Sequence, residues 1–369
     1  MAMGSRPEVQ TAPAPVVALD VALGMEQMVT ALARVPFRHP FAGPSSALSN
    51  LGMSVTRETI RAFMGYASAL RIPEFRSLEL FLDEICKVIM PPFVHSLDVA
   101  CHQTELGGVP GIIYRHRQEP PLGVILYLHG GGYIGTSPNM YAFFTARVCK
   151  ETGCAVFVAD YRLAPEFPYP AGVEDASSVF AALVELGIPP TRILLAGDSG
   201  GGGLANSVIL DRENVAPNVT PAGLILFSPE VDLRLDEPSV TENAEHDILP
   251  WNIPTAAYLH GADATSRSIS PLTADLSGFP PTCVSWGGSE MFRDPIRRYV
   301  ERLRAAGVAT EAHEYDGMFH VFPILMPWLE DSHDVFRNLK SFVNKLVAGA
   351  PQWSDAALRR RLGLSPVVS

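Results

Sequence analysis

The stretch Thr191–Asn206, TRILLAGDSGGGGLAN, decides the expected fold. Its apolar run RILLA is of strand type, and from about Gly202 the sequence LANSVILDREN is typical of a helix. Ser199 lies between the two, with Gly197 two residues before it and Gly201 two residues after it. This G-x-S-x-G spacing predicts a sharp strand-to-helix turn that exposes the serine hydroxyl, although an ordinary glycine loop would fit the glycines alone.

Similar apolar runs recur on both sides of this stretch, separated by helical segments. Two alternating runs near His95 and Pro110 are typical of antiparallel edge strands. The remaining expected strands are residues 122–128, 155–159, 192–196, 223–227, 282–286 and 310–315. Strands that alternate with helices predict an α/β fold with a mostly parallel sheet of about eight strands, covered by helices on both faces.

The chain before the first strand is expected to be helical. Residues 1–18 are rich in Ala and Pro and are expected to be disordered, and residues 19–92 are expected to form helices that end before Pro91-Pro92. An N-terminal helical segment without strands suggests a cap over the following domain, 93–349. The alternative is a helical bundle that packs on the flank of that domain. Residues 230–270 would form an insert, and 350–369 a C-terminal tail.

Composition excludes several classes of protein. The 369 residues are 47% hydrophobic and carry a formal net charge of −11. This acidic balance argues against nucleic acid as a partner. The five cysteines are scattered, which favours reduced thiols and no metal site. No signal peptide is recognised and no stretch approaches the roughly 20 apolar residues of a membrane helix, so a cytoplasmic protein without a membrane span is expected.

A second glycine-rich motif, His129-Gly130-Gly131-Gly132, directly follows the apolar run LGVILYL. Successive glycines let backbone N–H groups point into a cavity, which an oxyanion hole requires. The expected donors are the N–H groups of Gly131, Gly132 and Gly200. A nucleotide-binding loop is the alternative, but no Lys-Ser/Thr pair follows and no G-x-G-x-x-G opens the helix.

A serine nucleophile needs a base and an acid from other loops at the same edge of the sheet. His320 follows the last expected strand, and the chain order serine, acid, histidine fits this fold. Glu290 is nearest the end of the TCVSW strand and is the expected acid, which would orient the imidazole. Asp294 is the second choice, because it opens a helix and has an alternative role as its N-cap.

These motifs together resemble the hormone-sensitive-lipase-like family of α/β-hydrolase serine esterases. HGGG, DYRLAPE at 160–166, GDSGG, SPL at 270–272, GSE-x-x-x-D and MFHVF occur in order between about 122 and 349. The resemblance implies an α/β-hydrolase catalytic domain, a helical cap built from the N-terminal segment and the insert, and ester hydrolysis without a cofactor. Two departures are Gly200, where the family usually has Ala, and Glu290, where it often has Asp.

The residues and the resemblance together predict a carboxylesterase for short or medium acyl chains, with deacetylation of a small apolar metabolite as one form. Alternatives are acyl transfer, lactone formation or opening, and amide hydrolysis by the same triad, or a non-catalytic small-molecule receptor. Tyr133 and Trp286 are expected to approach the site, with core packing as the alternative. The expected partner is a small ester, and an exposed last strand favours a homodimer.

Overall fold

The computed structural model describes residues 9–43, 45–250, 253, 255–348, 350, 354 and 356–361. Its central sheet has eight strands in the order β1-β2-β4-β3-β5-β6-β7-β8. β1 and β2 pair antiparallel, β2 also pairs antiparallel with β4, and all other neighbours are parallel. The strands are β1 Val99–Leu106, β2 Val109–His116, β3 Val124–Leu128, β4 Ala155–Ala159, β5 Ile193–Asp198, β6 Gly223–Phe227, β7 Thr282–Gly287 and β8 Thr310–Tyr315. The predicted α/β fold with a mostly parallel sheet is confirmed.

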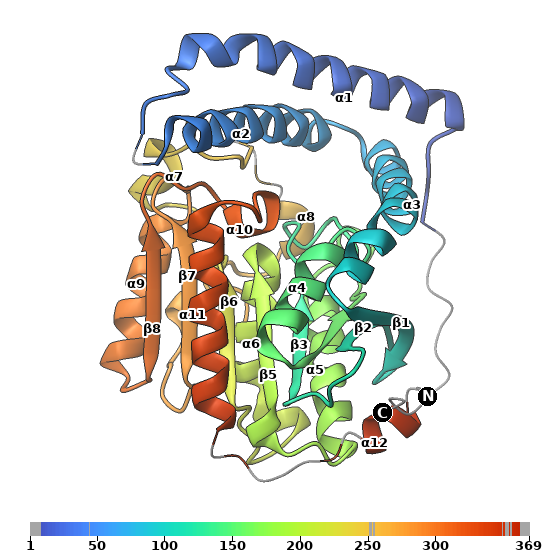
Figure 1. Ribbon diagram of the computed structural model, residues 1–369, viewed down its shortest axis with the longest axis vertical. Coiled ribbons are helices and arrows are strands. Elements are labelled where there is room, and N and C mark those ends of the chain that lie inside the picture. Colours follow the sequence, from blue (N-terminus) through green and yellow to red (C-terminus); the bar gives the residue numbers. More distant parts are fainter. Residues whose placement is uncertain are drawn as a thin grey trace.

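Helices cover both faces of this sheet because its central strands are apolar on both sides (Figure 1). Leu126 of β3 belongs to one buried cluster, whereas Ile125 and Tyr127 belong to the other. The first cluster is covered by α5 Ala171–Glu185, α6 Ser199–Val215 and α9 Arg293–Ala305. The second is covered by α4 Ala142–Thr152 and α11 Glu330–Val347. The parallel strands therefore bring their carboxyl ends, and the loops after them, to one edge.

Three N-terminal helices precede the sheet: α1 Ala14–Arg34, α2 Ala47–Ser68 and α3 Ile72–Ser96, with the 3-10 turn η1 Val35–Arg38 after α1. Figure 1 shows α1 and α2 lying across one end of the molecule and α3 descending beside the sheet. Arg61 of α2 interacts electrostatically with Asp247, which lies in the insert after β6. The N-terminal helices are thus next to the loops that follow the strands.

Two expected boundaries in this segment were wrong. α1 begins at Ala14, so residues 14–18 are helical rather than disordered, while residues 1–8 lie outside the described part of the chain. α3 continues through Pro91 and Pro92 to Ser96. Proline removes a helix hydrogen bond, but the last turn is held by buried Val94 and by an edge contact between the rings of Phe93 and Phe143.

The expectation about membrane helices also needs correction. Residues 14–38 form one helical stretch that is long and apolar enough to cross a bilayer by length and composition. In this structure the stretch packs on α2, where Tyr66 donates a hydrogen bond to buried Asp20 at 3.0 Å. Length and composition alone do not place the helix in a membrane.

The remaining elements are short. They are the turns η2 Pro190–Arg192 and η3 Pro271–Thr273 and the helices α7 Pro238–Glu242, α8 Thr255–Leu259, α10 Phe322–Leu325 and α12 Ala356–Arg361. α7 and α8 lie in the expected insert at 230–270, and residues 251, 252 and 254 of that insert are outside the described part. α12 shows that the expected C-terminal tail, 350–369, contains a helical turn; residues 362–369 are not among the described residues.

Candidate active site

Ser199 stands at the strained turn between β5 and α6. Its φ is +50°, a left-handed conformation that few non-glycine residues adopt. A Cβ on Gly197 would lie 2.4 Å from the carbonyl oxygen of Gly201, and one on Gly201 would lie 2.1 Å from that of Leu128. Both glycines are therefore required by backbone that passes too close for any side chain. Ser199 opens α6, where backbone N–H groups have no acceptor within the helix.

Asp198 ties this turn to the glycine loop that follows β3. Its Oδ1 accepts hydrogen bonds from the Tyr127 hydroxyl at 2.7 Å and the Gly130 N–H at 3.0 Å. Its Oδ2 accepts one from the Tyr141 hydroxyl at 2.8 Å. Burial raises the pKa of Asp198 to about 6, and these donors oppose the rise. One buried carboxylate thus fixes the loop relative to Ser199.

The three expected oxyanion donors lie on these two connected segments. Gly131 and Gly132 have φ values of +116° and +60°, so the loop needs residues without a Cβ. Within the described part of the chain, neither N–H donates to a protein acceptor. Gly200 is in the first turn of α6. Their assignment as an oxyanion hole stays a prediction.

His129 has a structural position in the same loop. The Tyr161 hydroxyl donates to the His129 carbonyl at 2.6 Å, and the two rings stack with centroids 4.5 Å apart. Burial lowers the pKa of His129 to about 4, so the ring is neutral at pH 7. Its Nδ1 is 2.9 Å from the hydroxyl of Thr136, which also donates to the Gly130 carbonyl at 2.5 Å. These contacts brace the glycine loop.

Glu290 and His320 are brought together at the edge of the sheet. Glu290 follows β7 and His320 follows β8, and Glu290 Oε2 lies 3.8 Å from His320 Nδ1. This distance exceeds that of a hydrogen bond. Glu290 Oε2 instead accepts from the Ser228 hydroxyl at 2.6 Å and from the Gly287 N–H at 3.1 Å. Glu290 Oε1 and His320 Nδ1 are both buried without a hydrogen-bond partner among the described residues.

Burial dominates the electrostatics of this pair. It lowers the pKa of His320 to about 3, which keeps the imidazole neutral at pH 7 and able to accept a proton. Burial, followed by the charge of Asp247, raises the pKa of Glu290 well above its usual range, against the hydrogen bonds from Ser228 and Gly287. Both side chains are almost fully inaccessible to solvent, and Glu290 Oε1 and His320 Nδ1 have no hydrogen-bond partner within the described part of the chain. A closer approach of the two side chains would let these atoms form a hydrogen bond.

Asp294, the second choice for the acid, has a different set of partners. It lies in the first turn of α9 and pairs with Arg293 at 2.8 Å. Its Oδ2 accepts a hydrogen bond from the Ser239 N–H at 3.0 Å, which joins α9 to α7. Arg293 lowers the pKa of Asp294. These contacts suit a charge at a helix N-terminus, and Glu290 is the carboxylate beside His320.

Ser228 is a residue of this site that the sequence reasoning missed. It follows β6, has a φ of +43°, and donates to Glu290. Its hydroxyl oxygen also accepts from the Val321 N–H at 3.1 Å. Ser228 thus joins the loops that carry Glu290 and His320. Its place directly after the GLILF strand, at the carboxyl edge of a parallel sheet, is the signal that could have revealed it.

Tyr133 packs directly against α6, the helix that begins at Ser199. Its ring is stacked on Tyr258 of α8, with centroids 3.8 Å apart and an interplanar angle of 9°. A Cβ on Gly200 would lie 3.2 Å from the Tyr133 ring, and one on Gly203 would lie 2.4 Å from its hydroxyl. Gly203 therefore makes room for this ring, and an alanine at position 200 would need a shift of a few tenths of an ångström by the ring.

Trp286, the other expected pocket residue, is buried near the end of β7. It belongs to the same large apolar cluster as Tyr133, and its Nε1 has no hydrogen-bond partner among the described residues. This burial is the arrangement expected of a core residue. A role for Trp286 or Tyr133 in contacting substrate stays a prediction.

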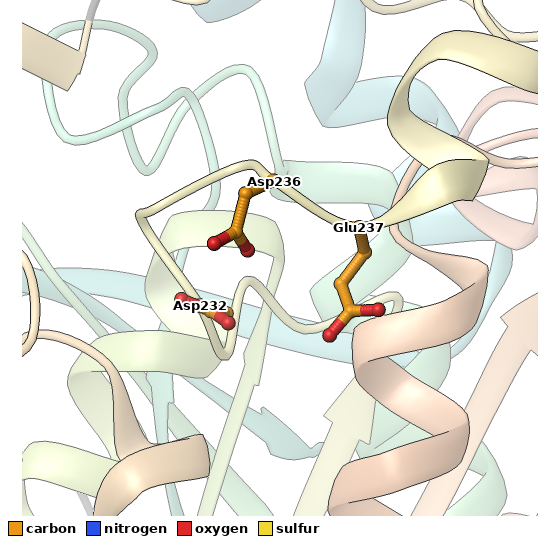
Figure 2. Close-up of side chains that lie close together, drawn as sticks. All are labelled: Asp232, Asp236 and Glu237. Atoms are coloured by element: carbon orange, nitrogen blue, oxygen red, sulfur yellow. The ribbon is translucent and has the colours of Figure 1, made fainter.

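A separate group of carboxylates follows β6 on the insert (Figure 2). Asp232, Asp236 and Glu237 bring oxygen atoms within 4.8 Å of one another. Arg234 forms ion pairs with Asp232 and Asp236, and Arg298 of α9 pairs with Glu237. Because each of the three carboxylates is already paired with an arginine, we assign no cation to the group.

Comparison with known proteins agrees with this arrangement. Residues 125–324 match the model of a family described by its alpha/beta hydrolase fold. The chain is 30% identical over 296 residues to an esterase of Acinetobacter venetianus, covering 79% of this chain and 95% of that protein. It is 27% identical over 357 residues to the carboxylesterase/phospholipase LipF of Mycobacterium tuberculosis, covering 88% and 92%.

A solved structure described as a hormone-sensitive lipase from a metagenome library superimposes with a TM-score of 0.71. It is 30% identical and covers 79% of this chain and 98% of its own. The fold and the relatives define a carboxylic ester hydrolase of the α/β-hydrolase class. The chain belongs to the hormone-sensitive-lipase family of esterases within that class, as its motifs predicted.

Proposed function

We propose that this protein is a serine carboxylesterase that hydrolyses small esters of short to medium acyl chains, with Ser199 as nucleophile, His320 as base and Glu290 as acid. One observation carries the proposal: a serine at a strained elbow shares the edge of the sheet with a fully buried histidine–carboxylate pair, 3.8 Å apart. Such pairs often tighten only when substrate is bound.

The reaction follows from these groups. Ser199 Oγ attacks the ester carbonyl carbon while His320 Nε2 takes the hydroxyl proton, and Glu290 stabilises the imidazolium through Nδ1. The N–H groups of Gly131, Gly132 and Gly200 hold the negative oxygen of the tetrahedral intermediate. His320 then protonates the leaving alcohol. Water then attacks the acyl-enzyme while His320 takes a proton from the water. His320 passes this proton to Ser199 Oγ when the acid is released.

The preference for short acyl chains is supported by the aromatic wall beside the nucleophile. The Tyr133 ring fills the space next to Gly200, and Tyr258 backs it. Ser199 itself is only 8% exposed, which leaves little room for a long chain without movement. A solved relative, 29% identical over 73% of this chain, was soaked with p-nitrophenyl butyrate, a short-chain ester.

The test compares wild type with Ser199→Ala on p-nitrophenyl acetate, butyrate, octanoate and palmitate. We expect hydrolysis that falls with chain length, and a loss of roughly 10⁴–10⁶ in kcat for Ser199→Ala. Ser207→Ala is the matched control, because Ser207 lies on the same helix and bonds only to backbone carbonyls. Ester turnover by Ser199→Ala at the wild-type rate would overturn the proposal.

The same assay separates hydrolysis from the alternative uses of the triad. Product analysis with and without added alcohol would show free acid as the product in both cases if water is the acceptor. A transesterified product as the main species would assign the site to acyl transfer. Saturable ligand binding by a folded protein without turnover of any ester would instead identify a receptor.

A further inference from the structure

We propose that Asp247 is a positioning residue that holds the loops of Glu290 and His320 at a fixed separation. The proposal rests on the triad proposed above. Asp247 comes from neither loop: it lies in the insert after β6, between α7 and α8. Its sequence context, AEHDILP, carries no motif that marks it for this role.

The contacts of Asp247 reach both loops. Its Oδ1 accepts a hydrogen bond from the His320 backbone N–H at 2.8 Å. Its Oδ2 accepts one from the N–H of Met291, the residue next to Glu290, at 2.7 Å. Oδ1 also accepts from the N–H of Ile248 at 2.8 Å, which fixes the rotamer of the side chain. A single carboxylate group therefore spans the distance between the acid and the base.

The insert grips the acid loop at two further points. The Asn243 side-chain Nδ2 donates to the Glu290 carbonyl at 2.8 Å. The Ser239 hydroxyl donates to the Met291 carbonyl at 2.8 Å. The insert thus holds the backbone carbonyl groups of Glu290 and Met291. Because the insert also contacts the His320 N–H through Asp247, it sets the spacing between the loop of the acid and the loop of the base.

The chemistry of the site requires a carboxylate at position 247. All three partners of the side chain are N–H donors, and a carboxylate accepts without donating. An amide of the same shape would keep one acceptor and turn an NH₂ group toward the Met291 N–H. Asp247 is fully buried, so its partners cannot be replaced by water. Burial raises the pKa of Asp247 to about 6. The titratable or charged residues that face Asp247 are Glu290, His320 and Arg61.

The test is the Asp247→Asn variant, assayed per active site by titration with a fluorophosphonate. We expect kcat to fall by roughly 10–100-fold, the range for partners that orient groups of a site, with KM changed less than about twofold. Asp263→Asn is the matched control: Asp263 is in the same insert, and among the described residues its side chain accepts hydrogen bonds from Thr265 alone. It should leave kcat unchanged.

The outcomes separate this inference from the proposed function. If Asp247→Asn lowers the melting temperature but keeps the wild-type kcat, Asp247 is only structural and the inference is wrong, while the triad stands. If Ser199→Ala is as active as wild type, the triad itself is wrong. Should Asp247→Asn fail to fold, Asn243→Ala removes one tether of the same insert and should lower kcat at unchanged KM. No change in kcat would then overturn the inference.

Discussion

The turn at Ser199, called the elbow here, and the N-terminal helices α1 to α3, the expected cap, are built in opposite ways. Around Ser199, backbone atoms approach so closely that glycine is required, and the whole β5 strand is buried. In α1, only Asp20 and Gly24 are buried, whereas Met25 and Val29 are 61% and 64% exposed. The elbow is thus specified by its own local packing. The cap is held by buried apolar side chains such as Met53 and Val94 and by polar contacts to the loops of the sheet domain.

Three contacts show how the cap is anchored. Asp20 of α1 accepts from Tyr66 of α2. Arg76 of α3 pairs with Glu166 in the loop after β4 at 2.6 Å. Asp83 of α3 accepts from the Asn139 side chain at 2.9 Å. Two of these anchors reach the segments next to the glycine loop, so the cap can move only by breaking them.

The largest effect is expected from adding one methyl group at the elbow. In Gly201→Ala the new Cβ would meet the carbonyl oxygens of Leu128 and His129 at 2.1 and 2.4 Å. Neither backbone group can move without disturbing β3, so we expect a loss of about 3 kcal/mol or more in unfolding free energy, measured by urea denaturation.

The matched change in the cap is Gly65→Ala on α2, where no atom lies within 4 Å of the new Cβ. It should stabilise the protein by about 0.5–1 kcal/mol, because alanine is the better helix former. Equal effects of the two substitutions would contradict the comparison between elbow and cap.

An intermediate effect is expected from removing the main anchor of α3. Arg76 is buried and pairs with Glu79 at 2.8 Å as well as with Glu166. Arg76→Met keeps the apolar stem but leaves two carboxylates without their cation, so we expect a loss of about 3 kcal/mol. Limited proteolysis should then cut within residues 9–96 before it cuts the sheet domain. An unchanged cleavage pattern would show that the cap does not depend on this anchor.

The smallest effect is expected on the outer face of α1. Val29→Gln replaces an exposed apolar side chain with a polar one, and we expect a change within about 0.5 kcal/mol in unfolding free energy. Urea denaturation of the purified protein measures it. A loss above about 1 kcal/mol would mean that Val29 is covered in solution.

The same contrast explains what the sequence could predict. The strands and Ser199 could be found because their signals are local: apolar runs, glycine spacing and position after a strand. Glu290 and His320 were predicted from chain order, and the structure brings them within 3.8 Å. The end of α3 was not predicted, because tertiary contacts at Val94 overrode the proline signal. The start of α1 was missed because residues 14–18 lie in an Ala- and Pro-rich segment, whose composition predicts disorder.

Asp247 has no signal in the sequence, and Ser228 has only its place directly after the GLILF strand. Both act through hydrogen bonds to groups from other loops, 62 to 93 residues away for Ser228 and 44 to 73 for Asp247. Serine and aspartate in loops are common, so residue type alone does not single them out. Only the three-dimensional arrangement shows which of them faces the acid and the base.

The most direct test of the account is covalent labelling of the intact protein with a fluorophosphonate, followed by mass spectrometry of its peptides. Activation of Ser199 by the buried pair predicts one adduct per chain, located on Ser199 and absent from Ser199→Ala. Folded wild-type protein that takes up no label, or takes it up at another residue, would contradict the claim that this elbow holds the nucleophile.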